Sequence, residues 1–101
     1  MTTKRKSSAV RLLAELGGDY NFGSMLAAIR EGEGYSQSEM ARRLGISRSH
    51  LCDIEKRRKA VSLARAAEFA RTLGLSEKQF VRVAVQELVD ETGLQVQVVF
   101  A

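Results

Sequence analysis

The 101-residue sequence has no proline, no tryptophan, a single histidine and a single cysteine. Because Cys52 has no second cysteine to pair with, no disulfide can form within the chain, and nothing indicates an oxidising compartment. Long apolar runs are also missing, since no segment approaches the length that a membrane span requires. We therefore expect a soluble, cytoplasmic protein that makes no contact with a membrane.

The same scarcities argue against catalysis. His50 has no nucleophile partner, no glycine-rich loop is present to cradle a phosphate, and no spacing of His, Cys and carboxylates suits a metal ion. Cys52 is expected to pack as a small half-buried group without a redox role. We therefore predict no enzymatic activity, no cofactor and no metal site.

The sequence does contain enough apolar residues, 45% of the total, for one small domain, and its formal net charge is +4. The positive charge is unevenly placed. Residues 23–59 hold eight lysines and arginines against five acidic residues, whereas residues 60–101 hold four against five. An excess of this size is consistent with an anionic partner, but by itself it does not choose between nucleic acid, a membrane surface and simple solubility.

Apolar residues recur with helical spacing in six segments, bounded by serine caps and glycine stops. The predicted helices are Ser8–Leu16, one from Phe22 that stops at the glycines 32 and 34, Gln37–Leu44, Ser47–Lys56, Ser62–Leu73, and Ser76 to about Thr92. Two serines are spaced as capping boxes, Ser36 with Glu39 and Ser76 with Gln79. The last segment, LQVQVVF, alternates apolar and polar residues instead and predicts a strand over 94–100.

A sharp corner is predicted inside QSEMARRLGISRSHLCDIEK, residues 37–56. Gly45 interrupts an otherwise helical run, and glycine is the residue that most readily ends a helix in the left-handed conformation. Met40, Leu44, Leu51 and Ile54 would form the shared inner face of the two helices. The second helix then begins with Ser47, Arg48 and Ser49 facing outward, which is a helix-turn-helix pattern.

At these residues the chain resembles the Cro/cI-like helix-turn-helix family, also called the xenobiotic-response-element (XRE) type. The resemblance extends from about Phe22 to Val81 and includes SQSEMARRLGISRSHLCDIEKRRK and SLARAAEFARTLGLSEKQF. It implies a mainly α, five-helix, lambda-repressor-like DNA-binding domain at 21–92. In this chain the domain would be preceded by a basic tail and short extra helix at 1–20 and followed by a C-terminal β-strand at 93–101.

The resemblance also implies which residues meet double-stranded DNA. Those expected to contact bases are Ser47, Arg48, Ser49 and Asp53, and those expected to contact phosphates are Ser36, Gln37, Arg43, Lys56 and Arg58. Arg48, at the start of a helix, is suited to donate to guanine O6 and N7. Asp53 can only accept hydrogen bonds, most naturally from cytosine N4, or it can instead orient Arg48 or Arg57. Arg30 and Glu55 occupy positions where the family often has an ion pair. The proline that the family usually carries before the fourth helix is replaced by Val61-Ser62.

We also expect a homodimer, because one small module buries too little surface to select a site in a genome. The predicted last helix has two apolar strips. Phe80, Val83, Ala84 and Leu88 would cover the core, and Val81, Val85 and Val89 would face a second chain. The terminal strand, with Leu94, Val96, Val98 and Phe100, would pair with its own copy; alternatively, this tail would fold back on its own domain or be disordered in solution.

Together these features predict a sequence-specific transcriptional repressor that binds an inverted repeat. Two alternatives remain open. One is an antitoxin-type interaction module that grips a protein partner and binds DNA only to regulate its own synthesis. The other is a protein that coats DNA regardless of sequence, since phosphate binding requires only positive charge.

Overall fold

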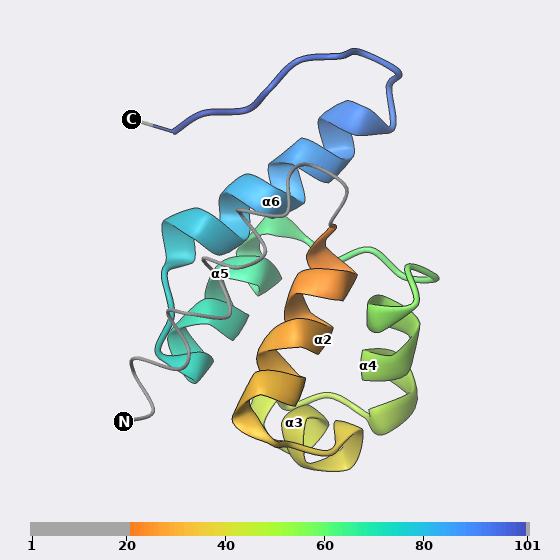
Figure 1. The fold of residues 1–101 in the computed structure, drawn as a ribbon, viewed down its shortest axis with the longest axis vertical. Helices are drawn as coiled ribbons and strands as arrows, with labels where there is room; N and C mark the ends of the chain where they lie inside the picture. Colours follow the sequence, from red (N-terminus) through yellow and green to blue (C-terminus); the bar gives the residue numbers. More distant parts are fainter. Residues whose placement is uncertain (1–20, 101) are drawn as a thin grey trace. The chain divides into compact units, whose positions relative to one another are not determined.

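The computed structural model describes residues 21–100, which form five helices and no strand. The helices are α2 (Phe22–Glu33), α3 (Gln37–Leu44), α4 (Arg48–Glu55), α5 (Leu63–Leu73) and α6 (Glu77–Asp90) (Figure 1). The five-helix prediction is therefore confirmed, whereas the predicted tail and helix within residues 1–20 lie outside the described residues. The chain divides into two compact units, with the boundary between Ala60 and Val61.

In the first unit, α4 packs against both α2 and α3. The apolar side chains buried in this unit are Phe22, Met25, Leu26, Ile29, Met40, Ala41, Leu44, Leu51 and Ile54. Gly23 allows α2 to approach the end of α4 closely, because a Cβ at this position would overlap the carbonyl oxygen of Ile54. The position of α4 is thus fixed by packing on two sides.

Polar caps define where each helix begins. Serines at 36, 47, 62 and 76 each accept a hydrogen bond from the backbone N–H three residues later. The two predicted capping boxes form only on the serine side, and the Glu39 carboxylate lies 3.9 Å from the Arg43 guanidinium instead. A reciprocal box occurs at α2, where Asn21 and Ser24 each accept the other's backbone N–H. That box was not predicted from the sequence.

In the second unit, α5 and α6 pack against each other. Their buried side chains are Ala66, Phe69, Ala70 and Leu73 from α5 and Phe80, Val83 and Ala84 from α6. Leu88, predicted to cover the core, is 50% exposed. The helix ends at Asp90, two residues earlier than predicted, and the Thr92 hydroxyl donates to the carbonyl of Val89 at 2.6 Å.

The predicted C-terminal strand is wrong for the described residues, since 94–100 contain no strand. This segment satisfies part of its backbone through a side chain of α6. Gln86 Nε2 donates to the carbonyl of Val96 at 2.9 Å, and Gln86 Oε1 accepts from the N–H of Val98 at 2.7 Å. One side-chain amide therefore supplies the donor and the acceptor that a neighbouring strand would have offered.

Candidate nucleic-acid interface

The corner between α3 and α4 has the predicted form. Gly45 has φ 72°, its N–H donates to the carbonyl of Arg42 at 3.2 Å, and the N–H of Ile46 donates to the carbonyl of Ala41 at 3.0 Å. Ser47 then returns to extended backbone, and its hydroxyl accepts from the N–H of His50 at 3.0 Å. The chain thus changes direction within three residues and begins a new helix at once.

Helix α4 has a buried face and an exposed face. Leu51 and Ile54 are 0% and 2% exposed, which anchors the helix to the core of the first unit. Ser47, Arg48 and Ser49 are exposed at its beginning. The Arg48 side chain has no hydrogen bond, ion pair or ring contact with any residue of the described part of the chain. Its guanidinium donors are consequently available to an external acceptor.

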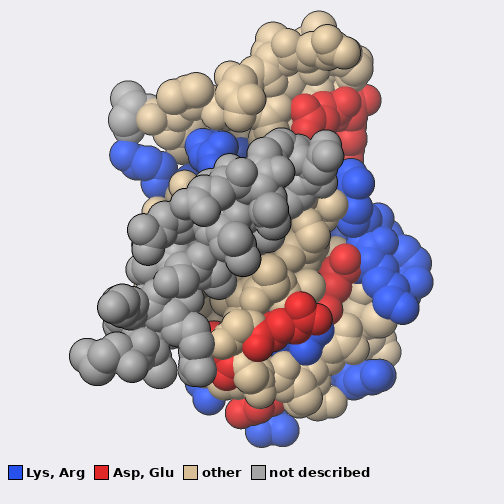
Figure 2. All heavy atoms as spheres, viewed as in Figure 1, with Lys and Arg blue, Asp and Glu red and all other residues tan. Residues whose placement is uncertain are grey.

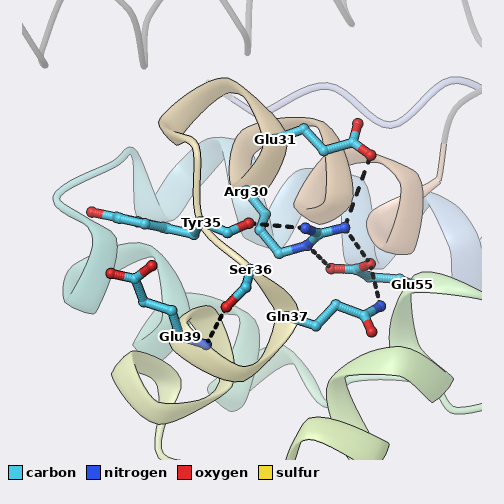
Figure 3. Close-up of polar contacts among 7 residues, drawn as sticks. All are labelled: Arg30, Glu31, Tyr35, Ser36, Gln37, Glu39 and Glu55. Atoms are coloured by element: carbon cyan, nitrogen blue, oxygen red, sulfur yellow. Dashed lines mark hydrogen bonds and ion pairs between the residues drawn. The ribbon is translucent and has the colours of Figure 1, made fainter.

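Glu55, near the end of α4, joins three helices (Figure 3). Its carboxylate accepts from Arg30 Nε at 2.8 Å and Nη2 at 3.2 Å, and from Gln37 Nε2 at 3.0 Å. Arg30 also donates to the carbonyl of Tyr35 at 3.0 Å. The hydrogen bond to Glu55 raises the pKa of Arg30 above its ordinary value, which favours the charged guanidinium. The expected ion pair between Arg30 and Glu55 is present, and Gln37 extends it to α3.

Asp53 pairs with Arg58, which was not among the partners considered from the sequence. Arg58 Nε donates to Asp53 Oδ1 at 2.9 Å, and Arg58 Nη2 lies 3.8 Å from the sulfur of Cys52. The bond to Asp53 raises the pKa of Arg58, and both side chains are at least partly exposed. Because Arg58 covers one oxygen of Asp53, the carboxylate presents less negative charge to an approaching phosphate.

A basic loop follows α4 directly. Lys56, Arg57, Arg58 and Lys59 are all exposed, and Lys and Arg side chains gather at the right-hand edge of Figure 2, where Figure 1 places the end of α4. Arg57 has φ 62°, the only positive φ of a non-glycine residue between 21 and 100. This turn was not visible in the sequence, because neither glycine nor asparagine marks it.

The other predicted phosphate contacts lie in and before α3. The Ser36 hydroxyl is exposed and accepts from the N–H of Glu39 at 3.1 Å. One N–H of the Gln37 side chain is already donated to Glu55. Arg43 lies over the ring of Tyr35, with its guanidinium carbon 4.4 Å from the ring centre. These contacts hold the side chains in defined positions. The Ser36 hydroxyl proton and the N–H groups of Arg43 can still donate to an acceptor outside the protein.

The residues predicted for dimerisation belong to the second unit. Val81, Val85 and Val89 of α6 are half-buried, as are Val98 and Phe100. Leu94 and Val96 are 61% and 54% exposed, and nearby in sequence Val99 is 79% exposed. The segment after α6 therefore carries apolar side chains in contact with solvent.

Neither a metal site nor a membrane-spanning helix emerges within residues 21–100. No group of three or more His, Cys, Asp or Glu side chains in this range is arranged to hold a metal ion. None of the five described helices combines the length and the apolar character that crossing a bilayer requires. Cys52 is a half-buried free thiol, as expected.

The comparisons with known proteins agree with this geometry. A sequence model of the helix-turn-helix family matches residues 26–80, which include the corner at Gly45, all of α4 and the basic loop. No curated protein and no solved structure matches the chain. The family match covers more than half of the sequence and coincides with the helices described above, so the chain belongs to the helix-turn-helix family of Cro/cI (XRE) type, a family of DNA-binding domains.

Proposed function

We propose that this protein is a sequence-specific transcriptional repressor that binds an inverted repeat as a homodimer, with α4 in the major groove. The observation that carries the proposal is the exposed first turn of α4. Ser47, Arg48 and Ser49 face solvent there, while Leu51 and Ile54 hold the opposite face in the core. A helix anchored in this way can enter a groove without losing its own packing.

Base reading is assigned to the exposed edge of α4. The unpartnered guanidinium of Arg48 can donate two parallel hydrogen bonds to guanine O6 and N7, and Ser47 and Ser49 can donate or accept beside it. Asp53 keeps one carboxylate oxygen that Arg58 Nε does not occupy. That oxygen suits the N4 amine of cytosine, the base that presents a donor and no acceptor in the major groove.

Phosphate binding is assigned to residues on both sides of the corner. Ser36 lies at the start of α3, where the first N–H groups of a helix lack internal acceptors and favour an anion. Gln37 and Arg43 follow on the same helix, and Lys56 and Arg58 lie at the end of α4. Contacts of this kind set the register of the protein on the duplex, whereas the bases determine sequence preference.

Homodimerisation is assigned to α6 and the segment after it, through Val81, Val85, Val89, Leu94, Val96, Val98 and Phe100. Exposed apolar side chains at 88, 94, 96 and 99 support this assignment, because burying them against a second copy removes apolar surface from water. Two copies related by a two-fold axis would read half-sites about 34 Å apart. The inverted repeat in the proposal follows from that symmetry.

Selection of bound sequences from a random duplex pool, followed by affinity measurements on Arg48→Ala, tests the DNA-reading part. We expect Arg48→Ala to lose about tenfold to a hundredfold in affinity for the selected site and little for random duplex. Arg42→Ala is the matched control, since it removes an exposed cation from α3 and should leave the preference unchanged. If Arg48→Ala weakened both duplexes equally, the protein would coat DNA and not read it.

Light scattering after size exclusion tests the dimer. The full chain should elute as a dimer and a chain that ends at Thr92 as a monomer, since the truncation removes most of the exposed apolar residues. An unchanged mass would exclude the segment after α6 from the interface. The same exposed residues would also suit a different protein, as in the antitoxin-type alternative; a monomeric full chain that forms a defined complex with one co-purifying protein would favour it.

A further inference from the structure

Four of the five described helices end in the same kind of turn, and in one of these turns the left-handed residue is not glycine. At the ends of α2, α3 and α5 a glycine adopts a left-handed backbone, with φ 76°, 72° and 70°. At the end of α4 the corresponding residue is Arg57, with φ 62°.

The hydrogen bonds show that the four turns are equivalent. In each, the N–H of the left-handed residue donates to the carbonyl three residues earlier, and the next N–H donates to the carbonyl five residues before itself. For α4 these bonds are Arg57 to Ile54 at 3.1 Å and Arg58 to Asp53 at 2.7 Å. The backbone at Arg57 therefore has the same left-handed conformation and the same hydrogen bonds as the backbone at Gly34, Gly45 and Gly74.

A side chain in this conformation is unfavourable, because its Cβ crowds the following carbonyl oxygen. Glycine at position 57 would relieve that crowding and would also remove one of four consecutive positive charges, which repel one another. Nothing within the described residues compensates, since the Arg57 side chain is exposed and has no hydrogen bond, ion pair or ring contact there. A polyanion outside the protein is a partner that a fourth positive charge at this point would attract.

We infer that Arg57 is a DNA-phosphate contact, held at the outer turn of the loop after α4 in a backbone conformation that disfavours it. The inference rests on the proposed function, because the phosphates belong to the same duplex that α4 reads. It assigns Arg57 a different role from Arg58, whose guanidinium is partly engaged by Asp53. A phosphate contact made by Arg57 carries no sequence preference.

Arg57→Gly in the full chain tests the inference, because it removes the side chain and supplies the residue that the turn favours. We expect the melting temperature to rise by about 4 °C. Affinity should fall by the same factor on the selected site and on random duplex, and the slope of log K against log salt should become shallower by about 1 per bound protomer. Stability and binding would thus move in opposite directions, which a purely structural role cannot produce.

Two controls make the result specific. Arg57→Lys keeps the cation and the backbone strain, so its melting temperature and salt slope should match those of the unmodified protein. Arg42→Ala removes one exposed cation elsewhere and should leave the slope unchanged. If the salt slope became shallower by the same amount in Arg42→Ala as in Arg57→Gly, the change would reflect net charge and not a local contact, and the inference would be overturned.

The remaining outcomes separate the inference from the proposed function. If Arg57→Gly is more stable but binds duplex DNA with an unchanged slope, the phosphate contact is wrong and the repressor proposal stands. If Arg57→Gly is not stabilised, the argument from backbone strain fails. If the unmodified protein binds no duplex at any salt concentration tested, the proposed function fails, and the inference fails with it.

Discussion

Two corners of this chain are built from nearly the same four residues, Leu44-Gly45-Ile46-Ser47 and Leu73-Gly74-Leu75-Ser76. In both, the glycine has a left-handed backbone, the following N–H reaches back five residues, and the serine caps the next helix. The helices that follow differ. α4 has 8 residues and begins with Arg48 and Ser49, whereas α6 has 14 and begins with Glu77, which is paired with Arg71 at 2.9 Å.

The two corners share one backbone turn and differ in the helix that follows, so the turn alone does not define a DNA-binding motif. A tight turn between helices is a general solution to chain reversal, and the second unit uses it to build a helix pair with an apolar tail. The first unit adds a third helix, α2, which packs on α4 and supplies Arg30 to Glu55. What distinguishes the two corners is the exposed chemistry of the second helix and the bracing behind it.

The largest expected effect comes from breaking that bracing at Glu55. The side chain is 6% exposed, and Glu55→Ala leaves Arg30 without its carboxylate partner. We expect a loss of about 3 kcal/mol in the free energy of unfolding, measured by urea denaturation. Glu55→Gln, which can still accept a hydrogen bond, should lose less. A loss in Glu55→Ala as small as that of an exposed ion pair would mean that the network does not brace α4.

Gly23→Ala should cause the next largest loss of stability, because the added Cβ would push α2 away from the carbonyl of Ile54. Overpacking of this kind is expected to destabilise the protein by about 2 kcal/mol in the same assay. Gly34→Ala is a useful comparison, since the space around it is open and only its backbone, at φ 76°, resists a side chain. We expect about 1 kcal/mol there. Equal losses at the two glycines would contradict the close approach of α2 and α4.

Removing the serine caps compares the two corners directly. Ser47→Ala and Ser76→Ala each delete one acceptor for a backbone N–H and should each cost about 1 kcal/mol of stability. Only Ser47→Ala should also weaken binding to the selected DNA site, measured by fluorescence anisotropy, because Ser76 caps a helix without a proposed DNA role. If Ser76→Ala impaired DNA binding to the same degree, the functional distinction between the corners would be lost.

The smallest effect is expected at Gln86, whose amide holds the segment after α6. Gln86→Met removes both of its bonds to Val96 and Val98, and since the site is partly exposed we expect a loss of about 0.5 kcal/mol in the free energy of unfolding. Hydrogen exchange is the more sensitive measurement, and the Val98 N–H should exchange faster. Gln86→Glu keeps the acceptor for Val98 and should protect that N–H better than Gln86→Met does. Unchanged exchange in both variants would show that the amide does not hold the segment.

The helices could be predicted from the sequence because their determinants are local. Apolar spacing, serine caps and glycine stops placed α3 at its observed bounds and placed the ends of α4 and α5 within one residue. The corner at Gly45 and the exposure of Arg48 follow from the same signals. The Arg30 and Glu55 pair was expected only through the family resemblance, because residues 25 positions apart carry no local sign of contact.

The parts that the sequence did not reveal depend on neighbours in space. Asp53 reaches Arg58 and not Arg48 or Arg57, because the left-handed turn at Arg57 folds the chain back over α4 without a glycine to signal it. The alternation in LQVQVVF suggested a strand, but a strand requires a partner backbone, and here a glutamine side chain of α6 takes that place. Nothing in the spacing of residues identifies such a substitute.

The carboxylate of Glu55 has a further thermodynamic consequence. Because it belongs to α4 and accepts from α2 and α3, the three helices are oriented before any ligand arrives. Association then requires little ordering of the backbone, and the entropy lost on binding is mainly that of long exposed side chains such as Arg48, Lys56 and Arg57. Association of this kind resembles rigid-body docking, in which only the exposed side chains become ordered.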